Sequence, residues 1–246
     1  MRLITLNTWG GRRGASLLDF FRRQAAVDVF LLQEVFHEGT TRTVFHDEEM
    51  PWLFKEIGAT LPEHRGHFAP SEAGEWGLAA FIKETVPIEA QGETFVFRHR
   101  DAMVGWDART VGRNLQYFRI TLGDKPLTLI NFHGLWNGRD KHDSPDRIEQ
   151  SQKIIDFIKT LSGDFILVGD FNLRPDTQSL KMLESELGLK NLVEEHRITS
   201  TRTSFYTKPE RFADYVLTSA GVNVQEFKVL PDEVSDHSPL LLEFTL

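Results

Sequence analysis

The stretch LTLINFHGLWNGRDKHDSPDRIEQSQKIIDFIKTLSGDFILVGDFN, residues 127–172, alternates between two kinds of hydrophobic pattern. Its ends, 127–135 and 165–169, are short apolar runs rich in residues that favour strands. Between them, 147–161 carries isoleucine and leucine at helical spacing, and a Ser-Gly dipeptide follows as a helix stop. This order of strand, helix and strand indicates an α/β protein.

The same alternation continues on both sides of this stretch. Apolar residues at helical spacing recur at 17–27, 40–61 and 176–188. Further strand patterns, one of which forms a hairpin with 127–135 through a Gly-Asp turn, occupy 3–6, 27–33, 67–70, 77–83, 88–97, 114–122, 212–219, 222–230 and 239–246. No internal repeat, low-complexity tract or linker interrupts them, so we expect one domain over residues 1–246.

Composition limits the classes of function. The 28 Lys and Arg residues against 36 Asp and Glu residues give a formal net charge of −8, which argues against a surface built for avid binding to bulk nucleic acid or anionic lipid. The best local basic candidate is a predicted loop at 98–113, with four Arg and two Asp residues. The chain has no cysteine, which excludes disulfides, thiolate catalysis and zinc–thiolate sites, whereas oxygen and imidazole ligands remain.

The beginning of the chain has no signal-peptide pattern, and the longest apolar runs are too short to cross a bilayer. We therefore expect a cytoplasmic protein without membrane insertion.

Five polar signatures stand at the ends of apolar strand patterns. They are LNTW at 6–9, LQE at 32–34, NFHGLW at 131–136, GDFN at 169–172 and SDH at 235–237. Charged groups at strand ends are aimed by a rigid sheet into one crevice. Each signature alone is weak, because GDFN is more often an Asx turn and a lone histidine is more often structural. Glu34 is less ordinary, since a carboxylate that ends a buried strand needs a cation or hydrogen-bond partners.

As an ordered set, these signatures resemble the endonuclease/exonuclease/phosphatase superfamily. This group includes DNase I-like nucleases, abasic-site endonucleases, tyrosyl-DNA phosphodiesterases, neutral sphingomyelinases and inositol polyphosphate phosphatases. The resemblance runs from LNTW to SDH and includes FADYVLTS at 212–219 and GRNLQYFRI at 112–120. It implies an α/β fold that is a four-layered sandwich, with two packed mixed β-sheets flanked by helices. It also implies metal-dependent hydrolysis of a phosphate ester.

The resemblance assigns a metal site to three residues. Glu34 corresponds to the main magnesium ligand, and Asn7 lies beside it as a ligand or as a hydrogen-bonding neighbour. Asp236 adds a further metal contact. A few hard oxygen ligands are what Mg²⁺ or Mn²⁺ prefers, so either ion is the expected cofactor.

The catalytic roles also follow from the resemblance. Asp170 corresponds to the carboxylate that orients and deprotonates the attacking water, and Asn172 holds a phosphoryl oxygen. His237 corresponds to the imidazole against the phosphate, with its other nitrogen held by Asp214. His133 stands where the family stabilises transferred charge or the leaving oxygen. Spreading negative charge in this way is what attack on a phosphate requires.

Aromatic and basic side chains are candidates for substrate contact. Arg113 and Trp136 are the substrate-binding candidates beside Asn172, and Trp9, Trp106 and Arg109 are open to either a substrate contact or a structural role. Trp9 stands where abasic-site endonucleases carry an acidic residue, which argues against that assignment.

The leading interpretation is a metal-dependent phosphoesterase in which water attacks phosphorus directly. Its partner would be a phosphate ester substrate, either nucleic acid or a small phosphorylated molecule, and we expect a monomer. The substrate stays open between a DNA end-processing or repair nuclease and a sphingomyelinase-like, sugar or inositol phosphate phosphoesterase. A non-enzymatic alternative is a phosphate-binding scaffold that has lost catalysis. The presence together of Glu34, Asp170, Asn172, Asp236 and His237 argues against that alternative, because binding alone would not require the water-activating carboxylate.

Overall fold

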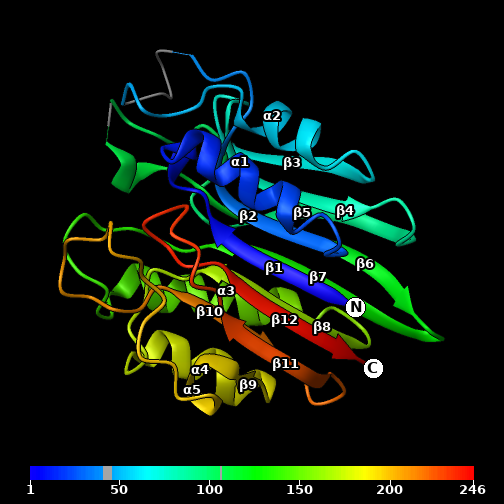
Figure 1. Cartoon of the computed structure of the whole chain (residues 1–246). Helices are drawn as coiled ribbons and strands as arrows, with labels where there is room; N and C mark the ends of the chain where they lie inside the picture. The colour runs from blue at the N-terminus through cyan, green and yellow to red at the C-terminus, as the bar shows by residue number, and fades with distance from the viewer. Residues whose placement is uncertain (41–45, 106) are drawn as a thin grey trace.

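The computed structural model describes residues 1–40, 46–105 and 107–246, and this part of the chain packs two six-stranded β-sheets against each other between helices (Figure 1). The predicted four-layered α/β sandwich is confirmed. Both sheets are mixed, and each contains one parallel strand pair within otherwise antiparallel neighbours.

The first sheet has the strand order β11-β12-β1-β2-β4-β3. Its parallel pair is β1 with β2. The strands are β1 (Arg2–Asn7), β2 (Val29–Phe36), β3 (His64–Glu72), β4 (Trp76–Lys83), β11 (Asn223–Val229) and β12 (Leu240–Thr245).

The second sheet has the strand order β5-β6-β7-β8-β10-β9, with β7 and β8 parallel. Its strands are β5 (Ile88–Phe97), β6 (Arg113–Leu122), β7 (Lys125–His133), β8 (Asp164–Asp170), β9 (Lys190–Asn191) and β10 (Asp214–Thr218).

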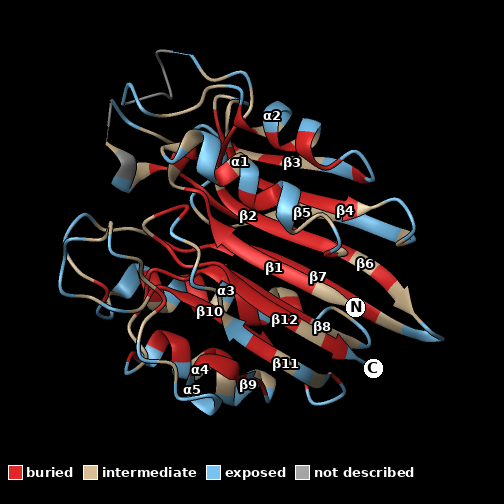
Figure 2. Ribbon diagram, viewed as in Figure 1, coloured by how far each residue is buried: buried red, intermediate tan, exposed pale blue. Residues whose placement is uncertain are grey.

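Helices form the two outer layers. Leu17 and Phe21 of α1 (Gly14–Arg23) and Ile57 of α2 (Leu53–Thr60) pack on the first sheet. The second sheet is covered by α3 (Pro145–Ile158), α4 (Gln178–Leu187) and the short α5 (Leu192–Glu195). Figure 2 shows the consequence, with buried strands between helices that are exposed on their outer faces.

Helix ends differ from the sequence-based expectation where local capping decides them. The helix expected at 147–161 begins at Pro145, because the Ser144 hydroxyl accepts a hydrogen bond from the Arg147 amide and proline fits the first turn. The helical region expected at 40–61 reduces to α2 in the described residues, and its part at 41–45 lies outside them.

A buried amide network joins the two sheets just below the ends of their parallel strands. Asn131 of β7 donates to the carbonyl oxygens of Leu32 and Ala79 at 3.0 and 3.2 Å and accepts from Gln33 Nε2 at 2.7 Å. Unpaired buried polar groups are costly, so this network fixes how β2 lies against β7. The residues that follow, Glu34 and His133, are thereby held near each other.

Among the described residues, no helix has the length and apolar character needed to span a membrane.

Candidate active site

Polar side chains gather where the two parallel strand pairs end. Asn7 ends β1, and Glu34 lies in β2 directly after the register partner of Asn7. His133 ends β7 opposite Asp170, which ends β8. Because the carboxyl ends of parallel strands share one edge of a sheet, packing the sheets together joins these two edges. Glu34, His133 and Asp170 line a cavity of about 570 Å³ there.

The backbone at this edge is locally strained. Trp9, Glu34 and Asn172 have φ angles of 52°, 56° and 54°, in the left-handed region that non-glycine residues seldom adopt. Each such residue costs about 1–3 kcal/mol, which the surrounding structure must offset. Gly169, with φ of 136°, precedes Asp170 where an added Cβ would collide with the Phe132 carbonyl oxygen. The glycine of GDFN is therefore required for the close approach of β8 to β7.

Asp170 is the most enclosed carboxylate of the cavity, with a side chain 2% exposed. Its Oδ1 accepts from the Asn172 amide at 2.8 Å, and its Oδ2 accepts from Asn7 Nδ2 at 3.0 Å. Burial opposes ionisation of Asp170, but the positive charges of His237 and Lys141 outweigh it and lower the pKa of the carboxyl group. These positive charges therefore favour the ionised form of Asp170.

The orientation of the Asn7 amide is fixed by the backbone. Its Oδ1 accepts from the Trp9 amide at 2.9 Å, so its NH₂ group points toward the carboxylates and donates to Glu34 Oε1 at 3.0 Å as well as to Asp170. In this arrangement Asn7 links the two carboxylates by hydrogen bonds and its oxygen faces away from them.

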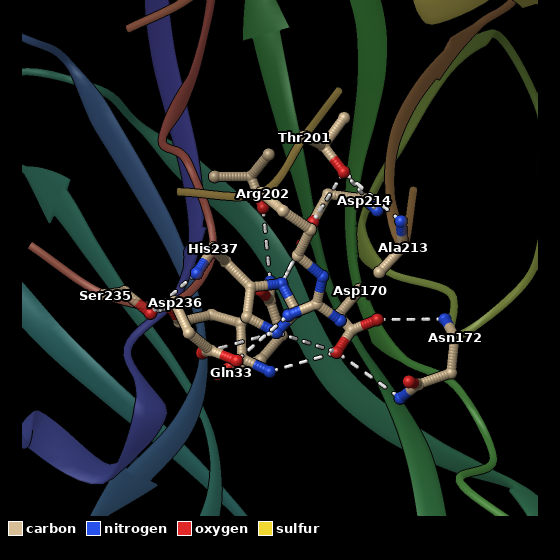
Figure 3. Close-up of polar contacts among 12 residues, drawn as sticks. Gln33, Asp170, Asn172, Thr201, Arg202, Ala213, Asp214, Ser235, Asp236 and His237 are labelled. Carbon is tan, nitrogen blue, oxygen red and sulfur yellow. Dashed lines mark hydrogen bonds and ion pairs between the residues drawn. The ribbon is translucent and has the colours of Figure 1, made fainter. Parts of the chain in front are cut away.

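The structure brings His237 and Asp214 together, as Figure 3 shows. His237 Nδ1 lies 2.8 and 2.9 Å from the two Asp214 carboxylate oxygens, and its Nε2 lies 3.6 Å from Asp170 Oδ2. The Thr201 hydroxyl donates to Asp214 Oδ2 at 3.0 Å and fixes that carboxylate in turn. Burial and Arg202 disfavour the imidazolium, but the three carboxylates around it outweigh them, so the pKa of His237 is raised.

His133 has a pKa shift in the opposite direction. Burial and the neighbouring Arg113 guanidinium hold its pKa well below the ordinary value. Arg113 Nη1 lies 3.0 Å from His133 Nδ1, and a guanidinium can only donate, so Nδ1 is the acceptor and the proton is on Nε2. That Nε2–H faces Glu34 Oε1 and Asp170 Oδ2, each at 3.7 Å. The surroundings therefore shift the pKa values of the two imidazoles in opposite directions.

Glu34 and Asp236 provide oxygens that suit a divalent cation. Desolvation is the largest influence on Glu34 and raises its pKa, with Asp236 and Asp170 adding to the effect. Asp236 Oδ2 pairs with Arg202 Nη1 at 3.2 Å, whereas its Oδ1 is buried without a hydrogen-bond partner among the described residues. A crowded group of carboxylates with an unpaired buried oxygen fits a hard cation such as Mg²⁺. The protonated Nε2 of His133 does not suit a ligand.

The Arg-rich loop predicted to be basic is largely neutralised. Arg109 is exposed and pairs with Asp107 at 2.7 Å, and Arg100 pairs with Glu93. Arg113, at the start of β6, is instead buried in the cavity wall. Trp106 lies outside the described residues.

Both Trp9 and Trp136 line the cavity, as the substrate-contact hypothesis requires. The cavity also contains residues that the motifs did not identify, namely Lys141, Arg202, Trp76 and Tyr206. None of them stands in a strand-end signature. Arg202 reaches the site because its backbone forms an isolated antiparallel β-bridge with that of His237. No local sequence pattern predicts this pairing.

A sequence model of the Endonuclease/Exonuclease/phosphatase family matches residues 4–237. The structure is similar to a mannosyl-6-phosphatase of Bacteroides thetaiotaomicron, with a TM-score of 0.78 and 19% identity over 100% of both chains. It is similar to a humanised TDP2 of D. rerio, with a TM-score of 0.74 and 16% identity over 100% of this chain and 99% of that one. It is also similar to the human Nocturnin catalytic domain, with a TM-score of 0.69 and 17% identity over 100% of this chain and 94% of that one. At these identities the likeness shows a shared fold.

Proposed function

Because this chain belongs to the endonuclease/exonuclease/phosphatase family, whose members are hydrolases acting on phosphoester bonds, we propose that it is a divalent-metal-dependent phosphoesterase. The observation that carries the proposal is the state of Asp170. Asp170 is buried in the cavity wall, and its Oδ2 lies 3.6 Å from Nε2 of His237 and 3.7 Å from Nε2 of His133.

In the proposed reaction, water attacks phosphorus in line with the leaving oxygen. A bond forms between the water oxygen and phosphorus while the bond to the leaving oxygen breaks. Asp170 orients the water and takes its proton, which becomes more acidic as the new bond forms. The low pKa of Asp170 ensures that this carboxylate is free to accept that proton.

The other side chains offset the charge that develops on the phosphoryl group. The Asn172 amide and the His237 cation bind phosphoryl oxygens, and Asp214 keeps the imidazole oriented. His133 donates a hydrogen bond from Nε2 to the developing negative charge, because its other nitrogen accepts from Arg113. Groups held in place before the reaction pay no reorganisation cost as charge develops.

Glu34 and Asp236 would hold the metal ion, and Asn7 would orient Glu34 through its NH₂ group. The ion would supply Lewis-acid stabilisation of the phosphoryl oxygens, worth several kcal/mol. Mg²⁺ or Mn²⁺ fits this set of oxygens.

The test is hydrolysis of p-nitrophenyl phosphate and bis-(p-nitrophenyl) phosphate with Mg²⁺ or Mn²⁺, compared with EDTA and with Asp170→Asn. We expect metal-dependent release of p-nitrophenolate that the variant loses. A parallel panel covers nicked, abasic and 5′-blocked DNA, RNA, phospholipids and phosphorylated sugars. If folded wild-type protein hydrolyses none of these with either ion, the proposed function is wrong.

A further inference from the structure

Lys141 is a buried cation whose hydrogen-bonding capacity is only partly used. It lines the cavity and is 5% exposed. Within the described part of the chain, its ammonium has one hydrogen-bond acceptor, Asn172 Oδ1 at 2.6 Å, and no carboxylate within ion-pair distance. An ammonium has three donors, and a buried cation is costly unless its donors find acceptors. Two donors therefore remain for a ligand in the cavity.

The segment that carries Lys141 is held rigidly. Arg147 is fully buried in α3, and its guanidinium donates to the carbonyl oxygens of Asp140 at 2.8 Å, Leu135 at 3.3 Å and His142. The Arg174 amide donates to the carbonyl oxygen of Lys141 at 3.0 Å. Fixed backbone on both sides of Lys141 means that its ammonium is positioned before any ligand arrives.

Lys141 also decides which way the Asn172 amide faces. An ammonium can only donate, so the atom against it is Oδ1. The NH₂ group then donates to Asp170 Oδ2 at 3.3 Å and to the Gly134 carbonyl oxygen at 3.4 Å. Amide and ammonium therefore present donors to the same region beside Asp170.

Two buried cations of the cavity wall, Lys141 and Arg113, distinguish between ligands. Neither has a carboxylate within ion-pair distance among the described residues, and Arg113 Nε also lacks a hydrogen-bond partner there. A phosphate monoester dianion brings two negative charges to this pair, whereas a diester brings one.

We propose that Lys141 recognises a doubly charged terminal phosphate, and that the substrate is a phosphate monoester. The inference rests on the proposed function and narrows its substrate class. Arg113, buried in the same cavity wall, supports the same conclusion, because two buried cations without an ion-pair partner call for more than one negative charge.

The experiment compares Lys141→Met with wild type on p-nitrophenyl phosphate and methyl p-nitrophenyl phosphate, which share a leaving group. We expect the variant to lose about 100-fold in kcat/KM on the monoester and less than about tenfold on the diester, as expected for a hydrogen bond to a charged group. Lys141→Arg should restore part of the monoester activity. Lys159→Met, at an exposed ion pair with Glu186 just after the end of α3, is the matched control and should behave as wild type.

Calorimetric binding of orthophosphate and dimethyl phosphate gives a second readout that requires no turnover. Wild type should bind orthophosphate more tightly, and Lys141→Met should abolish that preference. Equal losses on the monoester and the diester, or an unchanged preference for orthophosphate, would overturn the inference. If wild type hydrolyses only the diester, this inference fails while the proposed function stands; if it hydrolyses nothing but retains the Lys141-dependent preference, the proposed function fails alone.

Discussion

The β1–β2 pair and the β7–β8 pair have the same strand arrangement, but the carboxylates at their ends differ in exposure and pKa. Each pair is parallel and central in its sheet. Glu34, from the first pair, has a side chain 28% exposed and a raised pKa, whereas Asp170, from the second, is 2% exposed with a lowered pKa. An open carboxylate can exchange ligands, whereas an enclosed, ionised one is held in place to accept a proton. The difference suggests a metal-binding half and a proton-transferring half.

Among these substitutions, Asp170→Asn should have the largest effect on activity and tests the proton-accepting role of the second pair. The amide keeps the shape but cannot accept a proton from water, so kcat should fall by about 10³-fold or more with little change in KM. Steady-state kinetics on the best substrate of the panel measures this. A large rise in KM with unchanged kcat would show that Asp170 binds substrate instead.

Glu34→Gln should act through the metal. Removing the charge at the open half should weaken Mg²⁺ binding about 100-fold and reduce activity at low metal concentration accordingly. Titration of activity with Mg²⁺, together with calorimetric metal binding, checks this. Wild-type metal saturation in the variant would contradict the assignment, and Glu38→Gln, a nearby surface change, is the control.

Asp214→Asn should have a smaller effect, by about 10–100-fold in kcat, because His237 remains but loses its orienting anion. A neighbouring carboxylate raises a histidine pKa, so removing it lowers that of His237. NMR titration of the metal-free protein should show the shift toward lower pH. Combined with His237→Ala, the change should cost little more than His237→Ala alone, because residues that act as a unit are not additive. Full additivity in kcat would place Asp214 outside this unit.

Asn131→Ala should affect activity least and stability most, because it removes the amide that joins the two sheets. Gln33 and two backbone carbonyl groups lose a partner, so the free energy of unfolding should fall by about 2–4 kcal/mol. Chemical denaturation measures it, and Asn223→Ala, at an exposed strand position, should change it little. An unchanged unfolding free energy would mean that the two sheets are aligned by apolar packing alone.

Much of the fold and of the site could be predicted from the sequence, because apolar runs mark the strands and polar signatures stand at their ends. Asn7, Glu34, His133 and Asp170 follow apolar runs, and the hydrogen bonding of β-sheets brings such ends together. The pairing of His237 with Asp214 was predicted from the resemblance, and the structure places them in contact. What these residues do stays a prediction until activity is measured.

Other features depend on contacts that no local pattern encodes. Arg109 and Arg113 belong to one Arg-rich segment, yet one pairs with Asp107 at the surface and the other is buried against His133. The pKa of His133 is lowered by burial and Arg113, whereas that of His237 is raised by Asp214, Asp236 and Asp170. Lys141 reaches the cavity because Arg147, in the next helix, binds the carbonyl groups of its segment.

The pairing of β1 with β12 has a consequence for how the protein is made. β1 lies between β12 and β2, and the Met1 amino group donates to the Phe244 carbonyl oxygen at 2.8 Å. Synthesis proceeds from the N-terminus, so β1 leaves the ribosome long before the strand that completes its ladder. Pairing across nearly the whole sequence is also slow to form. Until residues 240–245 emerge, the nascent chain carries a bare apolar strand edge, the kind of surface that chaperones shield from aggregation.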